Sequence, residues 1–117
     1  MVGREGVYGA LGLPINFLDR TGRRLGGTIA RLLALEGRRP SAWLDCGRGA
    51  TATPYADQYD VALTVATRVV SAGESSTVET VVRAFSRARD VTAAPLDCTS
   101  LRTLEARIAE LVEERAR

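Results

Sequence analysis

Histidine and lysine are both absent from this chain of 117 residues. Without histidine, one chain cannot form a Cys-His or Ser-His catalytic pair, or a zinc site with a histidine ligand. Without lysine, it has neither the lysine of a P-loop nor an amine for a Schiff base. Its two cysteines are too few for a tetrahedral all-thiolate metal site. We therefore expect no resident cofactor or metal, and no catalytic constellation is recognisable.

Aromatic residues are also scarce, at 5% of the chain, and no apolar run approaches the roughly 18 residues of a membrane-spanning helix. The 16 basic residues are all arginine and face 14 acidic ones, giving a net charge of +2. A nucleic-acid-binding surface usually has denser positive charge and more aromatic stacking groups. We therefore expect neither a nucleic-acid partner nor a membrane span, and the length predicts a single domain over residues 1–117.

The first residues, MVGREGVYGALGLPINF, do not contain the charged segment and apolar run of a secretory signal. If Met1 is the native start, a cytoplasmic location is expected. If a signal precedes it in the gene, the expected location is periplasmic or secreted.

The clearest pattern is an alternation of apolar and polar residues, which predicts a long half-buried strand over 58–70. A polar connector at 71–76 leads to a second strand at 77–88, and the two are predicted to form an antiparallel hairpin. In the second strand, Val81 and Phe85 have the opposite parity to the other apolar residues. That change predicts either a β-bulge or burial on both faces.

The last segment, SLRTLEARIAELVEERAR, predicts an amphipathic helix of about four turns. Its apolar stripe consists of Leu101, Leu104, Ile108, Leu111 and Val112. Thr99 or Ser100 is the expected N-cap. Because this stripe must be buried, we expect the helix to pack on the sheet.

The remaining segments give weaker signals. Residues 3–12 predict one or two frayed helical turns, since four glycines dilute a helical spacing of apolar residues. A short strand is expected over Leu13 to Leu18, followed by a hairpin turn at 19–22. Between the turn residues Gly26-Gly27 and Pro40, positions 28–35 are compatible with a helix or a strand, and the close turn signals favour the strand.

The segment SAWLDC predicts another short strand, and residues 47–54 predict a turn and loop. Together these elements predict an α+β fold, an antiparallel sheet of about five strands with the C-terminal amphipathic helix packed on one face. Residues 1–13 are expected as a frayed or truncated N-terminal helix. The expected core consists mainly of Tyr59, Val61, Leu63, Val65, Leu104, Ile108 and Leu111.

Cys46 and Cys98 each end a short extended segment with the sequence LDC. They could lie close enough for a disulfide, which is expected if the compartment is oxidising; in the cytoplasm they would be two buried thiols. A reactive Cys46 is not favoured, because Asp45 opposes thiolate formation and Arg48 is the only adjacent cation.

Three further groups of residues are weak candidates for a site. Gly47 to Gly49 could form an anion-binding nest with Arg48, although a tight turn is the simpler interpretation. Several arginines fall on predicted turns and could contact a partner or an anion, or simply solubilise the chain: Arg20, Arg23, Arg24, Arg38 and Arg39. Four acidic residues suit acid–base chemistry by type alone: Asp57, Asp60, Glu74 and Glu79.

Five stretches of the sequence, distributed over most of the chain, resemble a group of uncharacterised bacterial envelope proteins that are periplasmic or lipoprotein-like. They are Leu11–Pro14, Leu25–Gly27, Trp43–Gly47 with its WLDCG, Ala56–Val65 with its alternating strand, and Cys98–Ile108 with its C-x-S-x-x-x-LE pattern. More loosely, the chain is similar to BamC-type lipoprotein domains, in which an antiparallel sheet wraps a helix.

The resemblance implies export and a Cys46–Cys98 bridge, and it supplies no catalytic residues. Residues 1–117 do not include the signal segment and lipobox cysteine of such proteins, so export and lipid anchoring both stay open. We expect a non-enzymatic interaction module of the bacterial cell envelope that binds a protein partner. The alternative is a small-ligand-binding domain that uses a cleft between sheet and helix, and a homodimer formed through strand edges is a further possibility.

Overall fold

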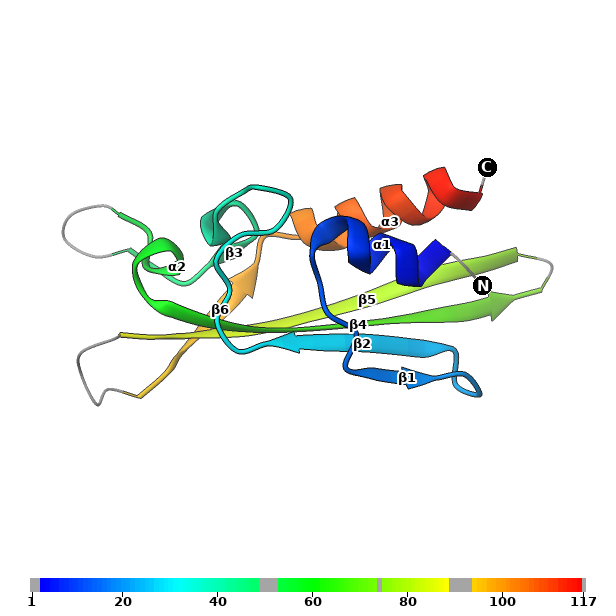
Figure 1. Ribbon diagram of the computed structural model, residues 1–117, viewed down its shortest axis with the longest axis horizontal. Helices are drawn as coiled ribbons and strands as arrows, with labels where there is room; N and C mark the ends of the chain where they lie inside the picture. The colour runs from blue at the N-terminus through cyan, green and yellow to red at the C-terminus, as the bar shows by residue number, and fades with distance from the viewer. Residues whose placement is uncertain (1–2, 49–52, 74, 89–93, 117) are drawn as a thin grey trace.

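The structure is a computed structural model that describes residues 3–48, 53–73, 75–88 and 94–116. It confirms the α+β class, with a C-terminal helix on one face of an antiparallel sheet. The described sheet has six strands, close to the five expected, in the order β1-β2-β4-β5-β6-β3. The molecule is elongated, with extents of 51 × 23 × 22 Å, and helices α1 and α3 lie side by side on one face of the sheet (Figure 1).

The long axis is set by the hairpin of β4 (Asp60–Ala72) and β5 (Ser75–Arg87). Their pairing runs from Asp60 opposite Arg87 to Ala72 opposite Ser75 without a break. The predicted hairpin is therefore confirmed, but the predicted connector at 71–76 is wrong, because most of it is strand. A β-bulge is also absent from this pairing, so the parity change in β5 has another cause.

Beside β4 lie β2 (Arg24–Ile29) and the edge strand β1 (Phe17–Asp19), which form the second hairpin. The hairpin was predicted, although its first strand is shorter than expected. Gly26 and Gly27 were expected to mark a turn but lie inside β2. At Gly27 a Cβ atom would be 1.8 Å from the carbonyl oxygen of Pro14. The close approach of the Pro14 backbone to β2 therefore requires a glycine at this position.

Positions 28–35 contain the end of β2 and then irregular chain, so the preference for strand is confirmed only in part. SAWLDC is mostly not a strand: it contributes to the 3-10 turn η1 (Pro40–Ala42) and the two-residue strand β3 (Leu44–Asp45). The one-turn helix α2 (Tyr55–Gln58) has no counterpart in the sequence-based prediction.

After β5, the chain returns as β6 (Leu96–Ser100) and then enters α3 (Thr103–Ala116). Thr99 and Ser100 belong to β6, so the predicted N-cap is wrong. The Ser100 hydroxyl instead accepts a hydrogen bond from the Arg102 backbone N–H at 3.1 Å and donates one to the Glu105 carboxylate at 2.7 Å. These bonds fix the sharp passage from strand to helix, where Arg102 has a φ of 70°.

Helix α1 (Gly3–Leu11) is a nine-residue helix with a buried apolar face rather than a frayed turn or two. Val7, Tyr8 and Leu11 are completely or almost completely buried against the sheet and α3. The glycine content of this segment predicted a frayed helix. That prediction was wrong because tertiary burial outweighs the low intrinsic helix propensity of glycine.

The core fills the space between the helices and the inner face of the sheet, the face that α1 and α3 cover. Six of the seven expected core residues are buried, and Tyr59 is only half-buried, with its ring stacked on Tyr55. The buried apolar residues are Val7, Tyr8, Leu11, Leu13, Leu25, Leu32, Leu35, Trp43, Leu44, Cys46, Ala56, Val61, Leu63, Val65, Leu104, Ile108 and Leu111.

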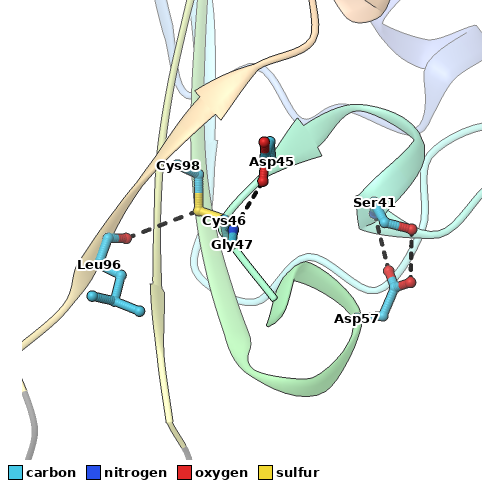
Figure 2. Close-up of a disulfide and its surroundings, with 7 residues drawn as sticks. All are labelled: Ser41, Asp45, Cys46, Gly47, Asp57, Leu96 and Cys98. Carbon is cyan, nitrogen blue, oxygen red and sulfur yellow. Dashed lines mark hydrogen bonds between the residues drawn. A yellow bond between two sulfur atoms is a disulfide. The ribbon is translucent and has the colours of Figure 1, made fainter. Parts of the chain in front are cut away.

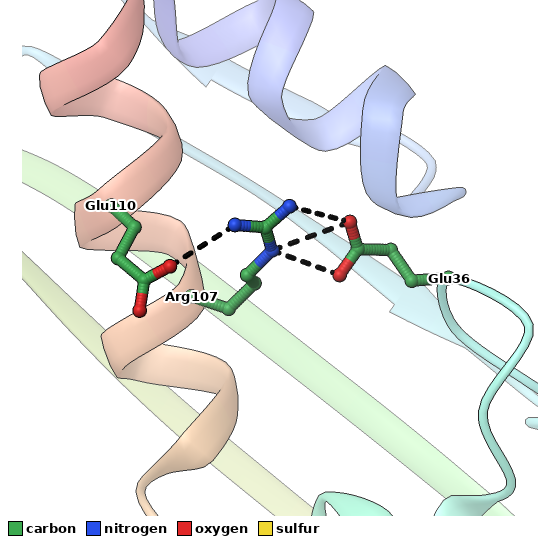
Figure 3. Close-up of polar contacts among 3 residues, drawn as sticks. All are labelled: Glu36, Arg107 and Glu110. Carbon is green, nitrogen blue, oxygen red and sulfur yellow. Dashed lines mark hydrogen bonds and ion pairs between the residues drawn. The ribbon is translucent and has the colours of Figure 1, made fainter.

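Glu36 connects the irregular segment after β2 to α3. Its carboxylate accepts hydrogen bonds from Arg107 at 3.0 Å, and Arg107 also contacts Glu110 at 3.1 Å (Figure 3). The Arg107 guanidinium lowers the pKa of the Glu36 carboxyl, mainly through these hydrogen bonds.

Candidate functional site

The face of the sheet that points away from α1 and α3, here called the outer face, carries exposed apolar side chains. Side chains alternate between the two faces of a strand, so the odd-numbered residues of β5 lie on the outer face together with the even-numbered residues of β4. Val81 is 55% exposed and Phe85 is 43% exposed. The parity change in β5 therefore places two large apolar residues in solvent, and neither burial on both faces nor a bulge explains it.

One row across the outer face joins four strands: Phe17 of β1, Gly26 of β2, Ala66 of β4 and Val81 of β5. The Phe17 ring lies over Gly26, where a Cβ atom would be 2.7 Å from the ring. A second apolar pair, Ala62 opposite Phe85, lies further along the hairpin. We call these six residues the outer patch.

A hollow of about 260 Å³ lies in the outer face beside Ala66 and Val81 of this row. Its lining also includes Arg24, Arg68 and Glu79. Ala66 is the small residue of this lining, and its short side chain leaves the space beside Val81 open. A hollow of this size is suited to one inserted side chain rather than to a large ligand.

Two ion pairs flank the hollow: Arg24 with Asp19 at 3.2 Å and Arg68 with Glu79 at 2.7 Å. The pKa of Asp19 is lowered, first by the hydrogen bond from the Gly22 backbone N–H and then by Arg24. These pairs put a polar border beside the apolar residues. An apolar centre with a polar border is the usual anatomy of a protein–protein interface.

Arg83 lies between Val81 and Phe85 on the same face of β5 and forms no ion pair with any residue that the structure describes. It therefore differs from Arg24 and Arg68, whose charges are matched within the chain. The outer face thus offers a guanidinium between two exposed apolar side chains.

Of the predicted arginine contacts, only Arg24 belongs to this surface. Arg23 donates a hydrogen bond to the Ser71 hydroxyl at 3.1 Å, near the β1–β2 turn. Arg38 lies over the Trp43 ring at 5.4 Å, and Arg39 precedes η1. The β1–β2 turn and η1 are far apart along the molecule, so these arginines do not form one cluster (Figure 1).

Cys46, directly after β3, and Cys98 of β6 form a disulfide with a Cα–Cα distance of 4.2 Å (Figure 2). The neighbouring Gly47 has a φ of 95°, and its N–H donates to the Asp45 carboxylate at 2.9 Å. Arg48 forms an isolated bridge with Pro54, while Gly49 of the predicted anion nest lies outside the described residues. The cysteine pair is therefore a covalent link between strands.

Three of the candidate acidic residues have structural partners. Asp57 accepts hydrogen bonds from the Ser41 backbone N–H at 3.0 Å and the Ser41 hydroxyl at 2.7 Å (Figure 2). Asp60 pairs with Arg31 at 3.2 Å, and Glu79 pairs with Arg68. Glu74 lies outside the described residues. Within the described ranges, no three His, Cys, Asp or Glu side chains gather as metal ligands.

Between the sheet and the helices, the centre is filled by core side chains such as Leu63 and Ile108. Space remains at the border of this interface, where a groove of about 500 Å³ separates β5 from the start of α3. None of the helices in the described ranges is long and apolar enough to cross a membrane.

Comparisons with protein-family models, curated proteins and solved structures gave no match. The resemblance to envelope proteins therefore stays a prediction. Sequence reasoning missed the outer patch, although the parity of Val81 and Phe85 was its signal. Phe17 and Gly26 gave no comparable signal, because they become neighbours only through the pairing of β1 with β2.

Proposed function

We propose that the protein is a non-enzymatic interaction module of the bacterial cell envelope that binds a partner protein through the outer patch. The observation that carries this proposal is the combination of exposed apolar residues, a hollow beside Val81, and Arg83, which forms no ion pair with any residue that the structure describes. Aromatic residues and arginine contribute most strongly to protein interfaces, which agrees with the composition of this surface.

The chemistry of the patch specifies the partner. The hollow beside Val81 takes an apolar side chain, and Arg83 takes a carboxylate that lies next to it. Because Arg24 and Arg68 are already matched by acidic residues, a strongly acidic partner would gain little from them. We therefore expect a protein surface with one protruding apolar residue and one adjacent Asp or Glu.

The assignment to the envelope rests on two supports. A disulfide between Cys46 and Cys98 is stable in an oxidising compartment, and the sequence resembles envelope proteins. Thiol alkylation in living cells, followed by mass spectrometry without reduction, tests this part. We expect no alkylated cysteine; two alkylated cysteines in the native protein would refute an extracytoplasmic location.

Photo-crosslinking tests the binding surface. A photoreactive amino acid replaces Val81 in one variant and the exposed Leu33 in a matched control, and both are expressed in the source organism. We expect a discrete adduct from position 81 only, and we expect Arg83→Glu to remove it. The crosslinked peptide of the partner should contain an acidic residue beside an apolar one.

Two results would contradict this proposal. One is an identical adduct pattern from positions 81 and 33. The other is an adduct from position 81 that survives Arg83→Glu in a variant with unchanged circular dichroism, because the charge at this position would then play no part in binding.

A further inference from the structure

Strand β5 is paired along its whole length on one side but only in part on the other. On the side away from β4 it pairs with β6 through residues 84–86 alone. The preceding residues, 75–83, have no described strand beside them. This stretch, here called the free edge, lies inside the longest hairpin of the molecule, whereas the strands β1 and β3 at the two ends of the sheet are only three and two residues long.

The direction in which the backbone N–H and C=O groups of β5 point follows from the hydrogen bonds of the neighbouring strand β4. Leu32 N–H donates to Val61 C=O at 2.8 Å, and Val69 N–H donates to Arg23 C=O at 3.1 Å. These bonds show that the odd-numbered residues of β4 point their backbone groups toward β2. The even-numbered residues of β4 therefore bond to β5, because hydrogen-bonded and non-hydrogen-bonded pairs alternate in an antiparallel ladder.

The odd-numbered residues of β5 stand opposite those even-numbered residues. Consequently Val78, Thr80 and Val82 direct their N–H and C=O groups away from β4, into the free edge. None of these backbone groups has a hydrogen-bond partner within the described part of the chain. The free edge is thus a row of donors and acceptors with the spacing of a β-strand.

The free edge carries the exposed charges of Glu79 and Arg83 on its outer side, but it lacks three other devices that usually prevent strand pairing. Long edges are normally blocked by a proline, a bulge or an inward-pointing charge. Here the pairing with β4 is regular, and the inward-pointing side chains of Val78, Thr80 and Val82 are β-branched. A strand beside them would pack its own inward side chains against these residues.

Space for such a strand exists. The groove of about 500 Å³ runs beside the free edge and is lined by Val78 to Val81 on one side and by Arg102 and Glu105 on the other. Glu105 is held by Ser100 and Arg102, so the far wall is fixed at the first turn of α3. The groove is therefore open along Val78 to Val81, a stretch that includes two of the three residues with outward backbone groups.

We infer that the free edge of β5 is a strand-addition site, which binds an extended polypeptide segment as an additional strand of the sheet. Main-chain hydrogen bonds to Val78, Thr80 and Val82 supply the affinity, and alternate β-branched or aliphatic residues of the segment enter the groove. This site shares Val81 with the outer patch, but its inward side chains and outward backbone groups do not depend on Phe17 or Phe85.

A segment of another protein fits this site better than a second copy of the chain does. In a two-fold pairing centred on the free edge, Ala72 and Gly73 of each copy would meet β6 of the other copy, since β6 occupies the space beside residues 84–86. A short separate segment ends before β6 and avoids this collision.

Amide hydrogen exchange measured by NMR tests the inference. In the protein alone, we expect the amides of Val78, Thr80 and Val82 to exchange at least about tenfold faster than those of Glu79 and Val81, which bond to β4. The probe is a soluble peptide of alternating valine and threonine with a lysine at each end. Its addition should slow the three fast amides at least about tenfold.

Val78→Pro removes the outward N–H without removing a bond to β4, and Val78→Ala is its matched control for lost side-chain packing. We expect the peptide to bind the proline variant at least about tenfold more weakly than the alanine variant. Val78→Lys, which puts a charge in the groove, should have the same effect if the proline variant does not fold. Phe17→Ala should leave peptide binding unchanged, which separates this test from that of the outer patch.

Three results would overturn the inference. The first is slow exchange of the three amides in the monomeric protein alone. The second is equal peptide binding by the Val78→Ala, Val78→Pro and Val78→Lys variants. The third is protection that appears with rising protein concentration and no peptide, because a second copy would then be the occupant.

Discussion

Tyr8 makes the buried polar contact that connects α1 with the sheet. Its hydroxyl is 2.9 Å from the Thr67 hydroxyl, which is in turn 3.3 Å from the Thr80 hydroxyl. Burial raises the pKa of the Tyr8 phenol, so the group stays neutral at physiological pH. The three hydroxyls form a chain across α1, β4 and β5, and this chain fixes the depth at which the helix lies on the sheet.

The Tyr8→Phe variant should be less stable by about 1 kcal/mol, because the ring remains buried and only one hydrogen bond is lost. Thr67 keeps Thr80 as a partner, which limits the cost. Urea denaturation of the two proteins measures the difference. An unchanged free energy of unfolding would mean that the hydroxyl contact contributes nothing to stability.

Ser86 presents the opposite situation. It is fully buried on the inner face, and its hydroxyl has no hydrogen-bond partner among the described residues. We expect Ser86→Ala to leave stability unchanged or to raise it by about 1 kcal/mol, since an unpaired buried hydroxyl is costly. Thermal and urea denaturation will show this. A clear loss of stability would reveal a partner for the hydroxyl.

Glu36 has a larger role at the level of elements, because it holds the irregular segment after β2 against α3. This contact takes the place of regular secondary structure in a stretch where only Leu32 and Leu35 are buried. The pKa of Glu36 is lower in the folded protein than its ordinary value of 4.5. The ion pair therefore stabilises the fold above this value, and the contribution disappears as the pH falls through the lowered pKa.

Glu36→Gln should reduce the free energy of unfolding at pH 7, and the difference from the wild type should shrink as the pH falls below 4.5. Glu110→Gln is the control, because Glu110 is the more exposed of the two partners of Arg107. Urea titrations at a series of pH values measure both variants. A difference that does not change with pH would exclude a role for the charge of Glu36.

The elements that could be predicted are those whose own sequence determines their burial. The period-two pattern of β4 and the apolar stripe of α3 specify both the element and its buried face. The prediction for α1 was wrong because Val7 and Tyr8 stabilise the helix only through contacts with α3 and Thr67, which lie far away in the sequence. The helix α2 depends likewise on contacts with η1 and β3.

At the scale of the whole molecule, the disulfide joins the segment between β2 and β4 to the far side of the sheet. It links positions 52 residues apart and lies next to the two-residue pairing of β3 with β6. So short a pairing contributes little by itself. The covalent bond therefore reinforces an attachment that also includes hydrogen bonds from Leu101 and Thr103 to the carbonyl groups of Trp43 and Ala42.

Replacement of Cys46 and Cys98 by serine should lower stability by as much as about 4 kcal/mol, the value for a loop of this length in the chain-entropy model. The wild type should lose a similar amount when a reductant is present, and the double variant should not respond to the reductant. Urea denaturation with and without dithiothreitol measures both. Equal stability of all four samples would contradict a stabilising disulfide.

The outer patch is a property of the whole sheet and not of any one strand, which limits what the sequence could reveal about it. Val81 and Phe85 already stood out by parity, but the hollow is also lined by Arg24 of β2 and Ala66 of β4. That neighbourhood depends on the strand order, and local patterns do not specify strand order. The same limit applies to the turn arginines, because the path of the chain determines whether they lie together in space.

The packing of α1 against α3 has a consequence for synthesis on the ribosome. The β4–β5 hairpin consists of contacts between residues close in sequence, so it can form soon after it emerges. The apolar side chains of α1 must wait for α3, which follows the hairpin in the chain and covers them. Until then the inner face of the sheet is exposed, and this interval is when the nascent chain is most prone to aggregate.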